Sequence, residues 1–193
     1  MCIRDRLWVK DGKKLSEWSF WNFGAQAQLG FPFEDGEEIL IDKRAGSYFY
    51  VTFLPSKLGG ATFYLTGLRD SDGNMLNGHD TYKLNVPADV PAKDFWSAIV
   101  YNMETKNFNR GVDRVGASTK DLDKMIKNAD GSVDVYYAPD LDEVPEGYEA
   151  NWVTTESATD ATDWFFLFRL YRPETKDWFK TWMLNDVENI SKQ

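Results

Sequence analysis

The sequence nearly lacks the two side chains that most often build metal sites and nucleophilic catalytic centres. Among 193 residues it has one cysteine, Cys2, and one histidine, His79. No disulfide can therefore form within the chain, and a zinc site made of cysteines and histidines is excluded. A Ser-His-Asp triad is excluded away from His79. His79 itself is either a general base beside Asp80 or an exposed turn residue.

The sequence also lacks long apolar runs and an excess of positive charge. No run approaches the roughly 20 apolar residues of a membrane span, so we expect no membrane span. Lys and Arg number 22 against 31 Asp and Glu, a net charge of −9, which makes nucleic acid an unfavourable partner. The sequence contains no P-loop, dinucleotide fingerprint, Gly-x-Ser-x-Gly or His-Glu-x-x-His motif, and we predict no cofactor.

Aromatic side chains, in contrast, are abundant. They make up 16% of the chain, and hydrophobic residues as a whole make up 42%. Such a composition is typical of a globular domain, and the aromatic rings suit both sheet faces and stacking surfaces.

The N-terminal end is predicted to differ from the rest. Residues 1–6, MCIRDR, resemble a translated sequencing adapter, which would mean that an upstream region and any export signal have been lost. Residues 7–30 are predicted to be a helical extension, because apolar side chains recur there on one helical face. These side chains are Leu15, Trp18, Trp21 and Ala25.

Residues 31–190 show many short apolar runs joined by turn residues, with few helical patterns. This arrangement predicts a mainly all-β domain, an antiparallel jelly-roll β-sandwich with one or two short helices. The Asp, Ser, Gly and Asn residues between the first two clear runs predict a polar hairpin turn. The expected strands are Ala61–Leu68, Thr81–Val86, Phe95–Tyr101, Val133–Tyr137 and Trp164–Tyr171, the last of them central.

Ser118–Asn128 is the best internal candidate for a helix. Ser118 or Thr119 would cap it, Asp121 falls in its first turn and Lys127 in its last. The residues that would form its apolar side are Leu122, Met125 and Ile126.

Six segments in a fixed order resemble the "domain of unknown function 1214" family over roughly residues 31–190. They are FYLTGLRDSDGNMLNG (63–78), YKLNVPADVPAKDFWSAIVYNMETKNF (82–108), NADGSVDVYYAP (128–139), EANWV (149–153), FFLFRLYRPE (165–174) and TWMLNDVE (181–188). The resemblance implies a jelly-roll sandwich, often preceded by a second sandwich, the "domain of unknown function 1254". It also implies export to the periplasm or the outside of a bacterial cell.

Five residues form the predicted ligand-binding cluster: Glu149, Asn151, Trp152, Arg169 and Tyr171. If Glu149–Thr155 is extended, Glu149 and Asn151 share one face, and the same rule places Arg169 with Tyr171. We expect the two segments to pair antiparallel across the tip at residues 154–163. A carboxylate, an amide and an indole are typical of a saccharide-binding surface, although the same side chains also cap loops and fill cores.

Arg169 stands inside the apolar run WFFLFRLY and needs a partner if it is buried. Glu149, Asp134 or Glu104 is expected to supply a carboxylate. The alternative is that Arg169 binds an anionic group of a ligand.

Asp70, Asp72 and Asn74 have the 1, 3, 5 spacing of a calcium loop, but the loop lacks the glutamate at position twelve. A polar turn is the preferred interpretation, so no metal site is predicted.

The functional prediction is a non-catalytic module that binds carbohydrate or another partner, or that supports assembly. Its partner would be a saccharide or other small molecule, an upstream sandwich domain or a second copy of the chain. The alternative is a carboxylate-dependent hydrolase acting on saccharides, whose acid and base cannot be located from sequence because such pairs are defined by separation in space.

Overall fold

The computed structural model describes residues 62–109, 111–156, 163–175 and 178–191, together with the backbone of six two-residue strands nearer the N-terminus. Those six strands are β1 (Asp5–Arg6), β2 (Val9–Lys10), β3 (Lys13–Lys14), β4 (Ser19–Phe20), β5 (Glu34–Asp35) and β6 (Glu38–Ile39).

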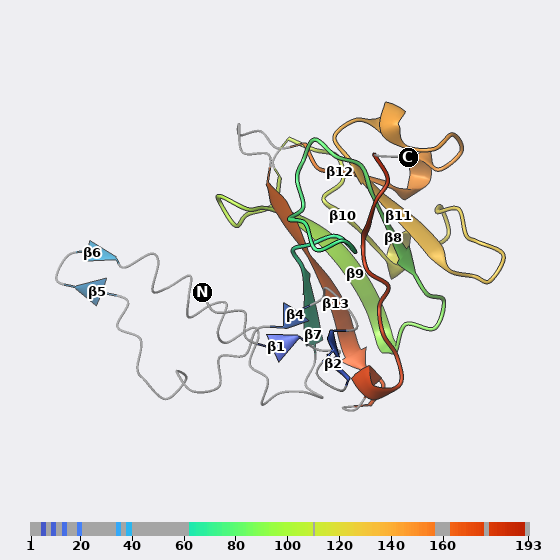
Figure 1. The fold of residues 1–193 in the computed structure, drawn as a ribbon, viewed down its shortest axis with the longest axis horizontal. Coiled ribbons are helices and arrows are strands. Elements are labelled where there is room, and N and C mark those ends of the chain that lie inside the picture. Colours follow the sequence, from blue (N-terminus) through green and yellow to red (C-terminus); the bar gives the residue numbers. More distant parts are fainter. Residues whose placement is uncertain are drawn as a thin grey trace.

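Two sheets make up the domain (Figure 1). The first has six strands in the order β1-β4-β7-β13-β9-β10, in which β7 is Thr62–Gly67, β9 is Ala92–Asn102, β10 is Gly116–Ser118 and β13 is Trp164–Pro173. The second has four strands in the order β12-β11-β8-β14, in which β8 is Tyr82–Val86, β11 is Val133–Ala138, β12 is Trp152–Thr154 and β14 is Glu188–Asn189. Strands β2 and β3 form a separate pair, as do β5 and β6.

The predicted fold class is confirmed as a mainly β, sandwich-like arrangement of two sheets. All pairings are antiparallel except that of β11 with β12, which is parallel. Helical structure in the described residues is confined to four three-residue 3₁₀ helices, so no described helix is long and apolar enough to cross a membrane. They are η2 (Thr119–Asp121), η3 (Leu141–Glu143), η4 (Glu149–Asn151) and η5 (Trp178–Lys180). The jelly-roll connectivity stays a prediction.

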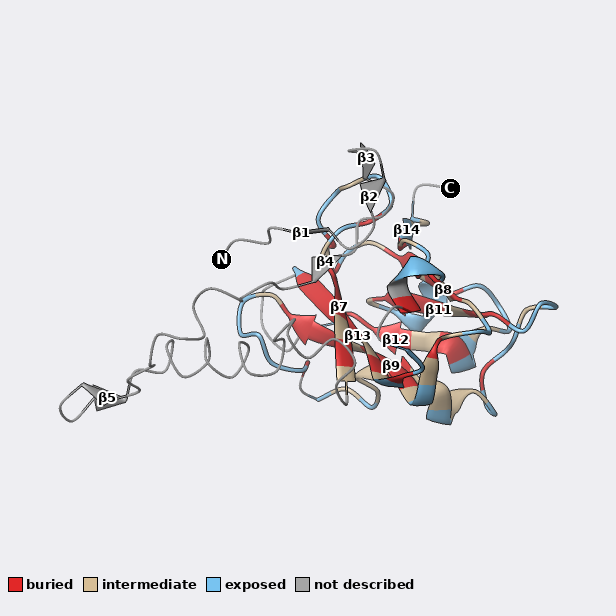
Figure 2. Ribbon diagram, turned by 90° about the horizontal axis from the view of Figure 1, so that it is seen from below, coloured by how far each residue is buried: buried red, intermediate tan, exposed pale blue. Residues whose placement is uncertain are grey.

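The main core lies between the two sheets, because alternate side chains of each strand point inward. Strand β13 contributes its even-numbered residues, among which Phe166, Phe168 and Leu170 are fully buried. Strands β8 and β11 face them with Leu84, Val135 and others. Each such side chain contributes roughly 1.5–3 kcal/mol through burial, which makes this layer the main source of stability. Figure 2 shows the buried residues running along the strands of both sheets.

Strand β13 is also buried on its other face, as its almost unbroken apolar sequence requires. Phe165 and Leu167 are 4% and 3% exposed, and they form a second cluster with Tyr101 of β9. The prediction that Trp164–Tyr171 is a central strand is therefore confirmed, with β7 on one side and β9 on the other.

The polar link between β7 and β8 is not a hairpin turn, because the two strands belong to different sheets. The link instead folds back on itself, with a bridge between Arg69 and Met75. Leu76, buried in the main core, donates its backbone N–H to the Leu68 carbonyl at 3.1 Å. The chain crosses from one sheet to the other at this point.

The helix predicted over Ser118–Asn128 is wrong. Only η2 forms, and Ser118 and Asp121 close a reciprocal capping box at its start. The N–H of Ile126, which would bond the carbonyl of Leu122 in a continuing helix, donates instead to the Asn151 side chain at 2.8 Å. A tertiary hydrogen bond has thus replaced the local helical one.

The helical extension predicted over residues 7–30 meets the described residues only at β2, β3 and β4, where the backbone is extended. At those positions the helix prediction is wrong, and the remainder of 7–30 lies outside the described residues. Ser19 of β4 pairs with Thr66 of β7, so the six-stranded sheet continues into this part of the chain. The predicted boundaries of the segments 1–6, 7–30 and 31–190 stay predictions.

Candidate functional site

The two halves of the predicted ligand-binding cluster lie in different sheets. Strand β12, which begins at Trp152, pairs in parallel with β11 of the four-stranded sheet. Arg169 and Tyr171 belong to β13, whose neighbours are β7 and β9. The antiparallel pairing that would have joined the two halves is therefore wrong, and the residues divide between two faces of the molecule.

Glu149 and Asn151 do not alternate along a strand, because both lie in η4. Glu149 is exposed, and its Oε1 accepts a hydrogen bond from the Gly147 N–H at 2.9 Å. This hydrogen bond lowers the pKa of the Glu149 carboxyl group. Asn151 in contrast is completely buried.

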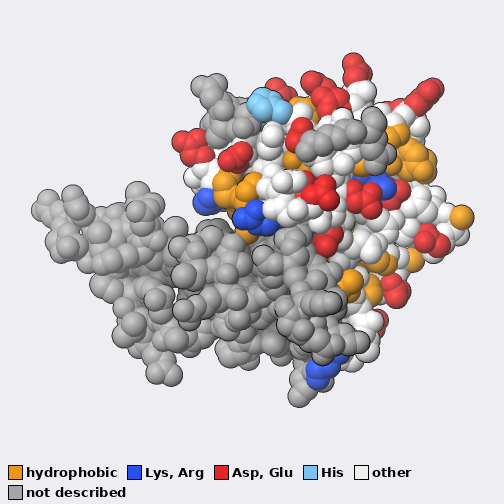
Figure 3. Space-filling view, viewed as in Figure 1, with side chains coloured by type: hydrophobic (Ala, Val, Ile, Leu, Met, Phe, Trp, Pro, Cys, Tyr) orange, Lys and Arg blue, Asp and Glu red, His pale blue; other side chains and the backbone are white. Residues whose placement is uncertain are grey.

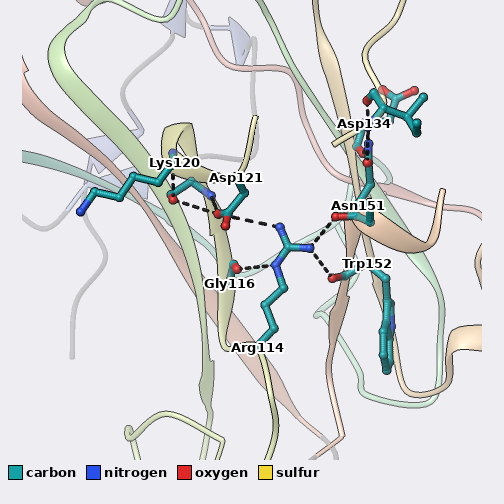
Figure 4. A network of polar contacts seen from close by, with 10 residues as sticks. Arg114, Gly116, Lys120, Asp121, Asp134, Asn151 and Trp152 are labelled. Atoms are coloured by element: carbon teal, nitrogen blue, oxygen red, sulfur yellow. Dashed lines mark hydrogen bonds and ion pairs between the residues drawn. The ribbon is translucent and has the colours of Figure 1, made fainter. Parts of the chain in front are cut away.

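The Asn151 amide joins three backbone groups of two separate segments (Figure 4). Its Nδ2 donates to the carbonyls of Ile126 and Asp134 at 2.9 and 2.8 Å, and its Oδ1 accepts from the Ile126 N–H. Both amide hydrogens are used in this way. Asn151 therefore serves to hold the loop after η2 against β11, which is the structural alternative to ligand binding.

Arg114 makes polar contacts with both sheets, and the sequence analysis did not single it out. Its Nε donates to the Gly116 carbonyl at 3.0 Å, and its Nη1 donates to the carbonyls of Ala150 and Trp152 at 2.6 and 3.0 Å. Its Nη2 lies 3.8 Å from the Asp121 carboxylate (Figure 4). One guanidinium thus ties β10 of the first sheet to the start of β12 in the second, and nothing in its sequence neighbourhood signals this.

Trp152 lies on the outer face of the four-stranded sheet. The register places Trp152, Tyr136, Lys83 and Glu188 in one row across all four strands. The Trp152 Nε1–H donates to the Ala138 carbonyl at 3.1 Å, and the ring, half-buried, packs in a small cluster with Tyr136 and Tyr148. The indole is therefore held in a fixed orientation on this face.

At the other end of the same row, Lys83 and Glu188 form an ion pair of 2.9 Å. The hydrogen bond to Glu188 raises the pKa of the Lys83 amino group. Glu188 is more than half exposed, so water screens the pair and its contribution to stability is small.

Beside this row lies a group of amides and carboxylates. Asn85 Nδ2 donates to Asp134 Oδ1 at 2.7 Å, and its Oδ1 accepts from the exposed Asn185 at 2.8 Å. We call the whole set the β8–β11 face; it consists of Lys83, Asn85, Asp134, Trp152, Asn185 and Glu188. Hydrogen-bonding side chains and one aromatic ring are thus presented together, all of them on strands except Asn185.

Arg169 lies on the outer face of the other sheet. Its Nη2 donates to the Tyr101 hydroxyl, and its guanidinium carbon lies 5.4 and 5.8 Å from the ring centroids of Tyr64 and Tyr101. The expected ion pair with Glu149, Asp134 or Glu104 is absent among the described residues. The guanidinium contacts these two tyrosine side chains instead. Tyr171 stacks on Phe95 with 3.9 Å between ring centroids.

The Asp70 loop is closed by its own hydrogen bonds. Asp70 is 1% exposed, and its Oδ1 accepts the backbone N–H groups of Asp72 and Asn74 at 3.1 and 2.8 Å. Its Oδ2 accepts from the Asn74 side chain at 3.2 Å. The described residues contain no group of three or more His, Cys, Asp or Glu side chains arranged to hold a metal ion.

His79 is exposed, as expected for a turn residue. Its backbone N–H donates to the Asn77 side chain at 2.7 Å. The neighbouring Asp80 carboxylate accepts from Asn189 at 3.1 Å and from the Tyr82 hydroxyl at 3.4 Å. Asp80 is therefore engaged by β14 and β8.

The described residues form a mainly β sandwich, and they include no cluster of side chains suited to hold a metal ion. Residues 61–175 match the family model described as "Protein of unknown function (DUF1214)", and the chain belongs to this family. No curated protein matches the chain.

Two solved structures are similar to the chain. The VPA0106 protein from Vibrio parahaemolyticus is 16% identical, with a TM-score of 0.56, over 78% of this chain and 35% of that protein. An uncharacterized protein from Burkholderia cenocepacia is 18% identical, with a TM-score of 0.41, over 69% of this chain and 31% of that protein. The first likeness supports the fold, and the chain spans only about a third of either protein's length.

Proposed function

We propose that this domain is a non-catalytic binding module that uses the β8–β11 face to bind hydroxyl-rich ligands, with saccharides as the ligand class. The observation that carries the proposal is the juxtaposition of Trp152 with a hydrogen-bonded group of amides and charged side chains on one outer sheet face. These side chains are held by each other and by the strands, so little ordering is required when a ligand binds.

The chemistry of the face suits a sugar. Amide groups both donate to and accept from hydroxyl groups, carboxylates accept from them, and an aromatic ring packs against the apolar side of a pyranose. Over the described surface in the view of Figure 3, acidic side chains are more prominent than basic ones, which favours a neutral ligand over a polyanion.

The alternative, a carboxylate-dependent hydrolase, has weaker support. A general acid in such an enzyme has a raised pKa. The two described carboxyl groups with shifted pKa values, Asp130 and Glu149, are both shifted downward by hydrogen bonds. Glu149, a member of the predicted ligand-binding cluster, is therefore poorly suited to donate a proton at neutral pH.

A glycan array and a panel of glycoside substrates test the proposal with the full chain. We expect binding without turnover, and we expect Asn185→Ala to weaken binding about tenfold, the loss typical of one or two hydrogen bonds. Asn107→Ala, which changes an exposed asparagine in the turn after β9, serves as the matched control and should bind normally.

Two outcomes contradict the proposal. Binding that Asn185→Ala leaves intact places the ligand elsewhere, and an array with no bound glycan removes the ligand class. Turnover that Glu149→Gln abolishes establishes the hydrolase instead.

A further inference from the structure

Two buried polar atoms, on residues paired across the outer face of the six-stranded sheet, have no hydrogen-bond partner in the described part of the chain. They are Nε of Arg169 and Oγ of Ser97, both buried. Arg169 and Ser97 are directly paired across β13 and β9, so their side chains emerge on the same face as neighbours. Leaving such donors unsatisfied costs about 1–3 kcal/mol each, which is a reason to expect a natural acceptor.

The guanidinium of Arg169 is held in place, and no carboxylate of the described residues neutralises it. Tyr64 and Tyr101 flank it, and the Tyr101 hydroxyl accepts from its Nη2. Aromatic rings and a hydroxyl group fix its position but carry no negative charge. The charge of Arg169, a partly buried residue, therefore has no carboxylate beside it among the described residues.

Other cations lie on the same face of this acidic protein. Lys106 lies 5.9 Å from the Phe165 ring centroid, and Lys120 lies 5.5 Å from that of Phe95. Both rings belong to the outer side of β13 and β9, on either side of Arg169. A protein with a net charge of −9 thus presents a row of positive charges over aromatic rings at this place.

We propose that Arg169 and Ser97 form a binding site for a carboxylate group. The Arg169 Nε–H and the Ser97 O–H supply one donor to each oxygen of a planar monoanion, and a single guanidinium balances its charge. A phosphate dianion would keep an unbalanced charge at a half-buried site, which is costly. The carboxylate belongs either to a glutamate or aspartate side chain that docks on the face or to a free organic acid.

This site is independent of the β8–β11 face, because it lies on the opposite sheet. Failure of glycan binding leaves it untouched, and its own failure leaves the proposed saccharide face untouched.

The test follows the ¹H–¹⁵N signal of Arg169 Nε in the full chain while acetate replaces chloride at constant ionic strength. We expect a saturable shift of this signal with acetate and none with acetamide, the neutral analogue of the same shape. Arg172 Nε is the internal control, because Arg172 is exposed on the same strand and its guanidinium lies 2.6 Å from Asp94. A shift no larger than that of Arg172, or an equal shift with acetamide, overturns the proposal.

Variants separate the two donors. Ser97→Ala keeps the guanidinium and should weaken acetate binding about five- to tenfold, in line with the loss of one charge-assisted hydrogen bond. Arg169→Met should abolish the stabilisation of the fold by acetate, read as a shift in melting temperature, whereas Arg172→Met should preserve it. Inorganic phosphate that binds as tightly as acetate also overturns the assignment to a carboxylate.

A last arm distinguishes the two sources of the carboxylate. N-acetylglutamate α-amide represents a protein side chain, and benzoate represents a free organic acid. Tighter binding of the first supports a docking segment, and tighter binding of the second supports a soluble ligand. Failure of both to bind counts against the site.

Discussion

At the scale of single residues, the sequence singled out Asn151 but left its role open between ligand binding and structure. Its position decides for structure, because a fully buried amide that bonds three backbone groups has no donor left for a ligand. No sequence pattern could have shown this, since Ile126 and Asp134 are 25 and 17 residues away along the chain.

Asn151→Ala is expected to lower the free energy of unfolding by about 3 kcal/mol. The substitution removes the three hydrogen bonds of a fully buried amide and leaves the N–H and C=O of Ile126 and the C=O of Asp134 without this partner. Urea unfolding followed by tryptophan fluorescence measures the loss. The control is Glu149→Ala, which removes an exposed carboxylate two residues away and should change stability by less than about 0.5 kcal/mol. Equal effects of the two substitutions would contradict this role for Asn151.

At the scale of elements, strands were predicted well where apolar residues are dense and poorly where pairing is non-local. The run WFFLFRLY predicts β13 because a strand buried on both faces has no polar alternation. The parallel pairing of β12 with β11 follows from no local signal, since it joins segments separated by the loop that contains η3 and η4. The helix over Ser118–Asn128 was wrong because propensity and capping residues compete with the Asn151 hydrogen bond, which only the folded chain provides.

The double burial of β13 gives a test at this scale. Leu167→Asn should cost about 3 kcal/mol of stability, because Leu167 is buried on the outer face and an amide there loses its water without gaining a partner. Tyr171→Asn, four residues along on the same face but half-buried, should cost clearly less. The comparison uses thermal and urea unfolding of the full chain. A loss for Leu167→Asn no larger than for Tyr171→Asn would show that the outer face is open to water.

At the scale of the whole molecule, the sequence predicted the class of fold from strand density and turn residues, but it did not predict which strands share a sheet. The first strong pair of runs resembled a hairpin and proved to be β7 and β8, one in each sheet. The candidate site was misplaced for the same reason. Trp152 and Arg169, which were expected on two strands paired with each other, point away from opposite sides of the sandwich. Assigning a strand to a sheet depends on the packing of distant residues, which a single sequence does not record.

The way in which the two sheets are tied together gives the last prediction. Arg114 contacts Gly116 in the six-stranded sheet and the carbonyls of Ala150 and Trp152 at the edge of the four-stranded sheet. Arg114→Met keeps much of the side-chain volume but leaves these carbonyls without their donor, so we expect a loss of about 3 kcal/mol. Arg172→Met, which removes an exposed arginine from the end of β13, should cost less than about 1 kcal/mol. Near-ultraviolet and far-ultraviolet circular dichroism, recorded through the same urea transition, measure both variants. If Arg114 holds the sheets together, its loss lowers the midpoint of both signals; an unchanged midpoint would mean that core packing alone joins the two sheets.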